Sequence, residues 1–175
     1  MESALPDWEL IVRTHGPMAF DTAWRLLGHA ADTEDVVQEA LLDAFRLHQR
    51  QPVANWGGLL RQLATRRAID RLRKRCMVDP LPPKSPGAER TSPVNLQPES
   101  SAIEQELADR LRLCVAELPD REATVFSLYY FGEMTNRHIA DSLGISTDAV
   151  GVALHKARKK LKTMLGLQDT SPRRS

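Results

Sequence analysis

The chain has 175 residues, of which 42% are hydrophobic, and its net charge at pH 7 is +1. This length allows one domain of ordinary size or two small helical ones. No uninterrupted apolar run is long enough to cross a bilayer, and the first twenty residues hold Glu2, Asp7 and Glu9 instead of a basic segment followed by an apolar one. We therefore expect an unprocessed cytoplasmic protein without a membrane span.

Metal and catalytic sites are not indicated. Cys76 and Cys114 form no CxxC pair, and the five histidines show no ligand spacing. The sequence has no nucleophile paired with a base and no glycine loop that would cradle a phosphate. We expect no metal, no cofactor and no catalytic residue, so an enzyme is a distant alternative.

The small net charge conceals a strong asymmetry along the chain. Acids dominate up to about residue 45, whereas the stretch from Arg61 to Arg75 holds six arginines and one lysine against the single acid Asp70. A second basic block runs from His155 to Lys162. Two separated basic surfaces indicate one polyanionic partner contacted twice, and the acidic region indicates a different partner.

The first two predicted helices precede the basic stretch. One covers Asp7 to Gly28 and is interrupted at His15-Gly16-Pro17, so we expect two helical pieces or one strongly bent helix. The next begins after Asp32, which we predict as its N-cap, and has an acidic first turn. Its exposed side, which alone is typical of a solvated surface, consists of Asp35, Gln38, Glu39, Asp43 and Arg46.

A third helix is predicted from Trp56 to Arg75, with an apolar inner face. Its other face is almost entirely basic and consists of Arg61, Arg66, Arg67, Arg71, Arg73, Lys74 and Arg75. Like charges at i, i+4 oppose helix formation, so this density favours phosphate neutralisation over a structural role.

Residues 77–101 contain six prolines and no helical period, which predicts an extended linker. Beyond it, a helical stripe is formed by Ile103, Leu107, Leu111, Cys114 and Leu118. Asp120 is predicted to cap a further helix that ends at Gly132.

The stretch from Thr135 to Lys162 predicts two helices joined by a tight turn. Thr135 and Ser146 are the expected N-caps, and Gly144 supplies the left-handed residue that ends the first helix. The second helix buries Val150, Leu154, Ala157, Leu161 and Leu165, and its opposite face has a basic edge. This is the pattern of a DNA-binding helix-turn-helix. An unrelated helical hairpin, or a lysine-rich end that complements the helix dipole, would show some of the same features.

Three stretches in this order resemble the extracytoplasmic-function group of bacterial sigma factors. They are LLGHAADTEDVVQEALLDAFR, then WGGLLRQLATRRAIDRLR, then ELPDREATVFSLYYFGEMTNRHIADSLGISTDAVGVALHKARKKLK. The resemblance covers nearly the whole chain outside the linker and the tail.

The resemblance implies a dissociable subunit of RNA polymerase. Its polymerase-binding residues would be Asp35, Gln38 and Glu39, on the helix that docks on the largest catalytic subunit. Recognition of the −10 promoter element, as melted single strand, would involve Trp56, Gln62, Arg66, Arg67 and Asp70. The helix-turn-helix would lie in the major groove of the −35 element. Its DNA-binding residues would be Asp148, Gly151, Val152, His155, Lys156, Arg158 and Lys159.

The recognition helix departs from the family pattern. Gly151, Val152 and Ala153 stand where a basic residue, a serine and an arginine are common, and Arg66 stands where asparagine is frequent. Gly151 and Ala153 cannot read guanine in bidentate fashion. Either the backbone approaches DNA closely there, with Val152 against a thymine methyl, or −35 reading is weak and rests on the polar residues around them.

The sequence thus predicts an all-α protein of two small helical domains joined by a Pro-rich linker, the second ending in a helix-turn-helix. The expected boundaries are 1–76 for sigma domain two, 77–101 for the linker, 102–166 for sigma domain four and 167–175 for the tail. Expected partners are core RNA polymerase and promoter DNA, with an anti-sigma protein as a further candidate. The alternative is a helix-turn-helix regulator that binds DNA without being a polymerase subunit.

Overall fold

A computed structural model describes residues 6–78 and 101–167, and the regular structure in this part of the chain is entirely α-helical. The helices are α1 (Trp8–Leu27), α2 (Ala30–Arg50), α3 (Trp56–Val78), α4 (Ala102–Glu117), α5 (Asp120–Tyr130), α6 (Asn136–Leu143) and α7 (Thr147–Met164). The all-α prediction is confirmed. The predicted linker and tail fall almost wholly outside the described residues, although α3 runs on to Val78, two residues into the predicted linker.

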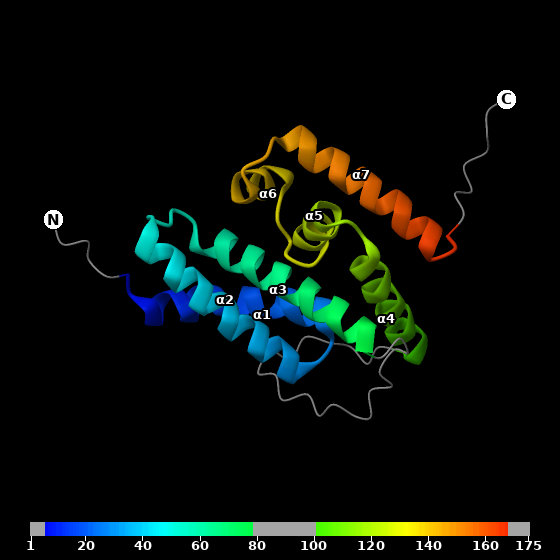
Figure 1. Cartoon of the computed structure of the whole chain (residues 1–175), viewed down its shortest axis with the longest axis horizontal. Coiled ribbons are helices and arrows are strands. Elements are labelled where there is room, and N and C mark those ends of the chain that lie inside the picture. The colour runs from blue at the N-terminus through cyan, green and yellow to red at the C-terminus, as the bar shows by residue number, and fades with distance from the viewer. Residues whose placement is uncertain (1–5, 79–100, 168–175) are drawn as a thin grey trace.

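We call α1–α3 the N-terminal helices and α4–α7 the C-terminal helices. In Figure 1 the N-terminal helices form one layer and the C-terminal helices lie across it, with α3 between the two groups. None of the described helices combines the length and the apolar character that a membrane crossing needs.

The N-terminal helices pack closely because small residues recur where they meet. Ala40 and Ala44 of α2 and Ala64 and Ala68 of α3 are each 0% exposed. Alanines four residues apart lie on one face of a helix, and their short side chains let two helix axes approach. The larger residues that fill the remaining core are Leu26, Leu27, Val36, Leu60 and Leu72.

Two local expectations in this region are corrected. Of the two alternatives for the first helix, two separate pieces is wrong, because α1 is continuous through Pro17, where the helix loses only one backbone hydrogen bond while its buried stripe still packs. Asp32 is not the N-cap of α2. His29 caps the helix, with Nδ1 accepting from the backbone N–H of Asp32 at 3.3 Å, and the Asp32 side chain is left for other partners.

The C-terminal helices differ from prediction at the start of α4 and α5. Ile103 and Leu107 are 78% and 52% exposed, so the predicted stripe of α4 is buried only from Leu111 onward. The N-cap of α5 is Pro119, and Asp120, predicted as the cap, is the first helical residue and pairs with Arg73 of α3.

The helix-turn-helix is formed as predicted by α6 and α7. Thr135 Oγ1 accepts from the N–H of His138 at 3.2 Å, and Ser146 Oγ accepts from the N–H of Ala149 at 3.1 Å. Gly144 ends α6 with φ of 66°, in the left-handed region that favours glycine. The pair shares a core of Val125, Leu128, Met134, Ile139, Ala140, Val150, Ala153 and Leu154.

A second hydrophobic cluster joins the two groups of helices. Ala68, Ile69 and Leu72 of α3 belong to the same buried cluster as Val115 and Phe126, from α4 and α5. These five side chains are at most 7% exposed. The two groups are therefore packed against each other through α3.

Candidate functional site

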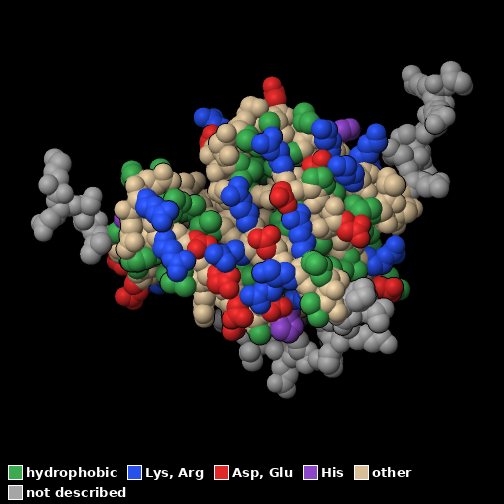
Figure 2. All heavy atoms as spheres, in the orientation of Figure 1, with side chains coloured by type: hydrophobic (Ala, Val, Ile, Leu, Met, Phe, Trp, Pro, Cys, Tyr) green, Lys and Arg blue, Asp and Glu red, His purple; other side chains and the backbone are tan. Residues whose placement is uncertain are grey.

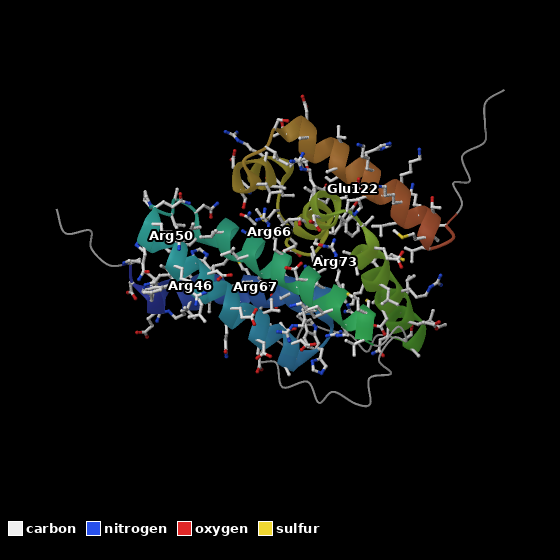
Figure 3. All side chains as sticks on the ribbon, in the orientation of Figure 1. Arg46, Arg50, Arg66, Arg67, Arg73 and Glu122 are labelled. Atoms are coloured by element: carbon white, nitrogen blue, oxygen red, sulfur yellow. The ribbon has the colours of Figure 1, made fainter. Side chains whose placement is uncertain are left out.

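The arginines of α3 that point toward α2 are paired with acids. Arg67 Nε donates to Asp43 Oδ2 at 2.6 Å, and its Nη1 donates to Glu39 Oε2 at 2.7 Å. Arg71 Nη1 donates to Asp32 Oδ1 at 3.1 Å, and Arg75 also donates to Asp32. Figure 3 shows Arg67 on the α2 side of α3. The acidic and basic stretches of the sequence thus meet within the molecule.

This pairing changes the ionisation of the groups involved. Burial by itself would raise the pKa of Asp32, but the hydrogen bond and charge of Arg75, with His29 and Arg71, outweigh it and lower the pKa. Burial would likewise lower the pKa of Arg67, but Asp43 and Glu39 raise it. Arg67, Arg71 and Arg75 are thus paired with acids of α2 in this structure, and a role of the arginine face in neutralising phosphates stays a prediction.

The outer face of α2 combines exposed acids with exposed apolar groups. The Asp35 side chain is 60% exposed, and Gln38 is also exposed. Glu39 is held by Arg67, so it is less free than its place in the sequence indicated. Leu42, one turn further on, is 55% exposed. A face of this kind is suited to contact with another protein.

Two exposed basic residues, Arg46 and Arg50, lie four residues apart at the end of α2 that is close to the start of α3 (Figure 3). Arg46 lies 3.5 Å from Asp43, so part of its charge is balanced within α2.

The predicted −10 residues do not all lie together. Trp56 belongs to an aromatic cluster, with ring centroids 5.2 Å from Trp8 and 5.4 Å from His48. Asn55, just before it, caps α3 by accepting from the N–H of Gly58 at 2.9 Å. Arg67 points toward α2, as described above.

Gln62, Arg66 and Asp70 occupy the face of α3 that is turned toward the C-terminal helices. The Gln62 amide lies 2.9 Å from Ser142 Oγ, and with its NH2 group toward α6 its oxygen accepts from Arg66 Nη2 at 3.3 Å. Arg66 and Asp70 line an open cavity of about 450 Å³ between α3 and the second group of helices. Figure 3 shows Arg66 and Arg73 directed into this space.

The predicted −35 residues form an outward-facing edge on α7. Asp148, His155, Lys156 and Lys159 are exposed, and basic side chains gather over this helix in Figure 2. Val152 is 53% exposed, whereas Ala153 is 4% exposed and packs in the core. A Cβ at position 151 would meet nothing within 4 Å.

Arg158 is held differently from its neighbours on α7. Its Nε donates to Tyr130 Oη at 2.6 Å, and its guanidinium lies 5.4 Å from the Tyr130 ring centroid. This stacking fixes the side chain against α5.

Among the described residues, no group of three or more His, Cys, Asp and Glu side chains is arranged to hold a metal ion. Cys76 and Cys114 are free thiols.

Two family models match separate parts of the chain. Sigma-70 region 2 matches residues 11–76, and Sigma-70 region 4 matches residues 108–161. The first match covers the N-terminal helices up to Cys76, and the second covers the helix-turn-helix and the helices before it.

Related proteins match over most of the chain. ECF RNA polymerase sigma factor SigE of Mycolicibacterium smegmatis is 24% identical over 176 residues, covering 99% of this chain and 67% of that protein. ECF RNA polymerase sigma factor SigW of Bacillus subtilis is 26% identical over 167 residues, covering 89% and 87%. A solved structure of the sigma factor RpoE from Bartonella quintana, in complex with the anti-sigma factor NepR, has a similar fold, with a TM-score of 0.56 at 15% identity over 94% of this chain and all of that one.

Proposed function

Because this chain belongs to the extracytoplasmic-function group of sigma factors, which direct promoter recognition as subunits of RNA polymerase, we propose that α2, α3 and α7 divide the work. The outer face of α2 contacts core polymerase, the face of α3 with Gln62, Arg66 and Asp70 reads the −10 element, and the exposed edge of α7 reads the −35 element. The rival assignment, a DNA-binding regulator independent of polymerase, is not favoured, because it gives no account of the match to region 2.

The observation that carries this assignment is the separation of internal from external charges. Arg67, Arg71 and Arg75 are neutralised by α2, whereas Asp35, Gln38 and Leu42 remain open to a partner. An exposed leucine beside exposed polar groups supplies both the apolar area and the hydrogen-bonding groups of a protein interface. On α7, exposed Lys156 and Lys159 lie where phosphate contacts would position the helix in the groove.

The polymerase contact is tested with charge reversal at a position that has little role in folding. Asp35 reaches Arg71 only at 3.9 Å, so Asp35→Lys should leave the thermal midpoint almost unchanged. Binding to core polymerase, measured by a shift in gel-filtration elution and by run-off transcription, should fall at least tenfold. Glu106→Lys makes the same charge change on an exposed position of α4 and should bind normally. Equal binding by both folded variants would contradict the proposed docking face.

Regulation by an anti-sigma protein is part of this proposal. RpoE of Bartonella quintana was solved with its anti-sigma factor NepR, and its fold covers 94% of the present chain. We place the protein in the cytoplasm, where its polymerase and promoter partners are. Purification of the tagged chain from its own cells, followed by identification of stoichiometric partners, tests both statements, and recovery of neither polymerase subunits nor a small inhibitor would count against them.

A further inference from the structure

The open cavity between α3 and the C-terminal helices has walls that the proposed function does not use. Besides Arg66 and Asp70 of α3, it is lined by Arg121 and Thr124 of α5 and by Ile145, in the turn before α7. Its volume of about 450 Å³ lies within the range of small-molecule sites. We propose that this cavity binds a mononucleotide, with the phosphates on Arg66 and Arg121 and an amino group of the base on Asp70.

The charges that line the cavity favour an anionic ligand. Asp120 of α5 is paired with Arg73 of α3, so these two charges balance each other. Arg66 and Arg121 form no salt bridge with any described carboxylate, and Asp70 forms none with any described basic residue. Two guanidinium groups against one carboxylate leave one positive charge. A guanidinium group also matches the geometry of a phosphate, to which it donates two hydrogen bonds at once.

A buried hydroxyl group in the cavity has no partner in the described part of the chain. Thr124 is 8% exposed and lines the cavity, and its side chain makes no hydrogen bond with any described residue. The first turn of α5 lies beside it, and the N-cap of that helix, Pro119, supplies no side-chain acceptor to the N–H groups of the turn. Buried polar groups are ordinarily hydrogen-bonded, so these groups call for a ligand that carries acceptor oxygens.

The remaining wall of the cavity is aliphatic. It consists of Ile69 of α3, Leu143 of α6 and Ile145, of which Ile69 is 3% exposed and the other two are half-buried. A flat ring packs well against such a wall, and an arginine side chain can stack on the same ring. An inorganic anion would leave these apolar groups uncovered. The wall therefore favours a nucleotide over free phosphate or pyrophosphate.

Asp70 gives the site a preference among bases. An ionised carboxylate only accepts hydrogen bonds, so it favours a base that presents an amino group, as cytosine does at N4. Uracil has an oxygen at the same position, and two acceptors facing each other repel. The expected order of affinity is therefore CDP before UDP.

This site goes beyond the proposed function. Arg66 and Asp70 also belong to the proposed −10 reading face, but Arg121, Thr124 and Ile145 do not. Nucleotide binding is measured on the free protein, without polymerase and without DNA. Its outcome therefore does not depend on whether α3 reads the −10 element.

Calorimetric titration of the free protein with CDP, UDP, cytidine and pyrophosphate tests the ligand class. We expect CDP to bind about tenfold more tightly than cytidine or pyrophosphate, because only CDP carries both the base and the phosphates. We expect it to bind about fivefold more tightly than UDP. Absence of CDP binding would overturn the proposal, and pyrophosphate that binds as tightly as CDP would overturn it in favour of a site for simple anions.

Three substitutions test whether CDP binds in this cavity. Arg121→Ala should keep the thermal midpoint, since Arg121 is exposed and has no described partner, and should weaken CDP binding about tenfold. Arg110→Ala, the matched change at an exposed arginine of α4 outside the cavity, should bind CDP as the wild type does. Asp70→Asn offers both a donor and an acceptor and should lose the preference for CDP over UDP. Wild-type affinity in Arg121→Ala, or a CDP preference that survives in Asp70→Asn, would overturn the assignment.

Discussion

Two helices of this protein carry dense positive charge, and they use it in different ways. On α3, Arg67, Arg71 and Arg75 are bound by acids of α2. On α7, the exposed Lys156 and Lys159 lie on an edge that faces solvent, beside His155. Lys160 is a residue of α7 that behaves like the α3 arginines, since its Nζ lies 2.9 Å from Oε2 of Glu122, a residue labelled in Figure 3.

The difference shows what a basic helix in a sequence does and does not indicate. The arginines of α3 follow an acidic helix by a short loop, so α2 and α3 become antiparallel neighbours and their charges meet. Only arginine presents a planar fork that can bind two acids or two carbonyls at once, as Arg67 and Arg73 do. The outer lysines of α7 have no preceding acidic helix of this kind. Residue type and the charge of the neighbouring helix distinguish the two cases better than charge density.

Removal of a charge from α3 should have the largest effect. Arg67→Ala leaves Asp43 and Glu39 without their partner, and we expect it to lower the free energy of unfolding by about 2 kcal/mol. This is less than for a fully buried pair, because 35% of the Arg67 side chain is exposed. Urea denaturation measures the loss, and the Arg67→Ala, Asp43→Ala double mutant should show that the two changes are not additive. An unchanged midpoint would mean that the pair contributes nothing to folding.

Acid should weaken the ion pairs between α2 and α3 over a defined pH range. The pKa of Asp32 is lowered in the folded state from its ordinary value of 3.8, so the carboxylate contributes stability above that pH and loses it as the pH falls through the folded pKa. Wild type should therefore lose stability below about pH 4 more steeply than Asp32→Asn, which we expect to cost about 1 kcal/mol at pH 7. Thermal unfolding between pH 7 and pH 2.5 measures both. Parallel curves of stability against pH for the two proteins would mean that ionised Asp32 does not contribute to the stability of the fold.

The sequence predicted what local chemistry decides. Thr135, Gly144 and Ser146 act within three or four residues of their own position, and the helix-turn-helix followed from them. Asp32 and Asp120 resemble caps equally well, yet neither caps a helix, because Arg75 and Arg73 take their carboxylates from more than 40 residues away. No short-range pattern contains that information.

The same limit applied to the candidate site. The face of α7 was predictable from its helical period, and the acids of α2 from their composition. The docking of α6 on Gln62 was not predictable, because it depends on how α4 and α5 pack against α3. That packing uses hydrogen bonds from α3 arginines to backbone carbonyls, such as Arg61 to Gly132 O. Backbone carbonyls carry no sequence signal, so arginines that bind them read as surface charge.

Removal of a charge from α7 should weaken DNA binding and leave the stability of the fold unchanged. Lys156→Ala should lower promoter affinity of the holoenzyme by about three- to tenfold, equally across −35 variants, and reduce the slope of log K against log salt by about 0.9. Its unfolding free energy should change by less than about 0.5 kcal/mol, since the side chain is exposed. A loss confined to particular −35 sequences would instead make Lys156 a base-reading residue.

The smallest change sharpens the comparison at the one helical position where α7 carries no side chain. Gly151 lies inside α7, and a Cβ added there would meet no atom within 4 Å. Alanine restricts the unfolded chain and has the higher helix propensity, so Gly151→Ala should raise the free energy of unfolding by about 0.5–1 kcal/mol. Loss of stability would mean that the helix is bent or crowded at this point in solution.

The same substitution separates the two explanations for Gly151 in promoter reading. If the helix backbone approaches DNA closely, the added methyl group meets a base edge, and −35 recognition falls while stability rises. If recognition is weak and rests on the polar residues around it, alanine leaves the preferred sequence unchanged. We expect the second result, because Asp148, His155 and Lys156 are exposed and project beyond the backbone of α7. Transcription from a promoter library randomised at −35, with Gly151→Ala and Asp148→Ala in parallel, decides between them. A preference that changes only in Asp148→Ala supports reading by the polar side chains, and one that collapses in Gly151→Ala establishes close backbone approach.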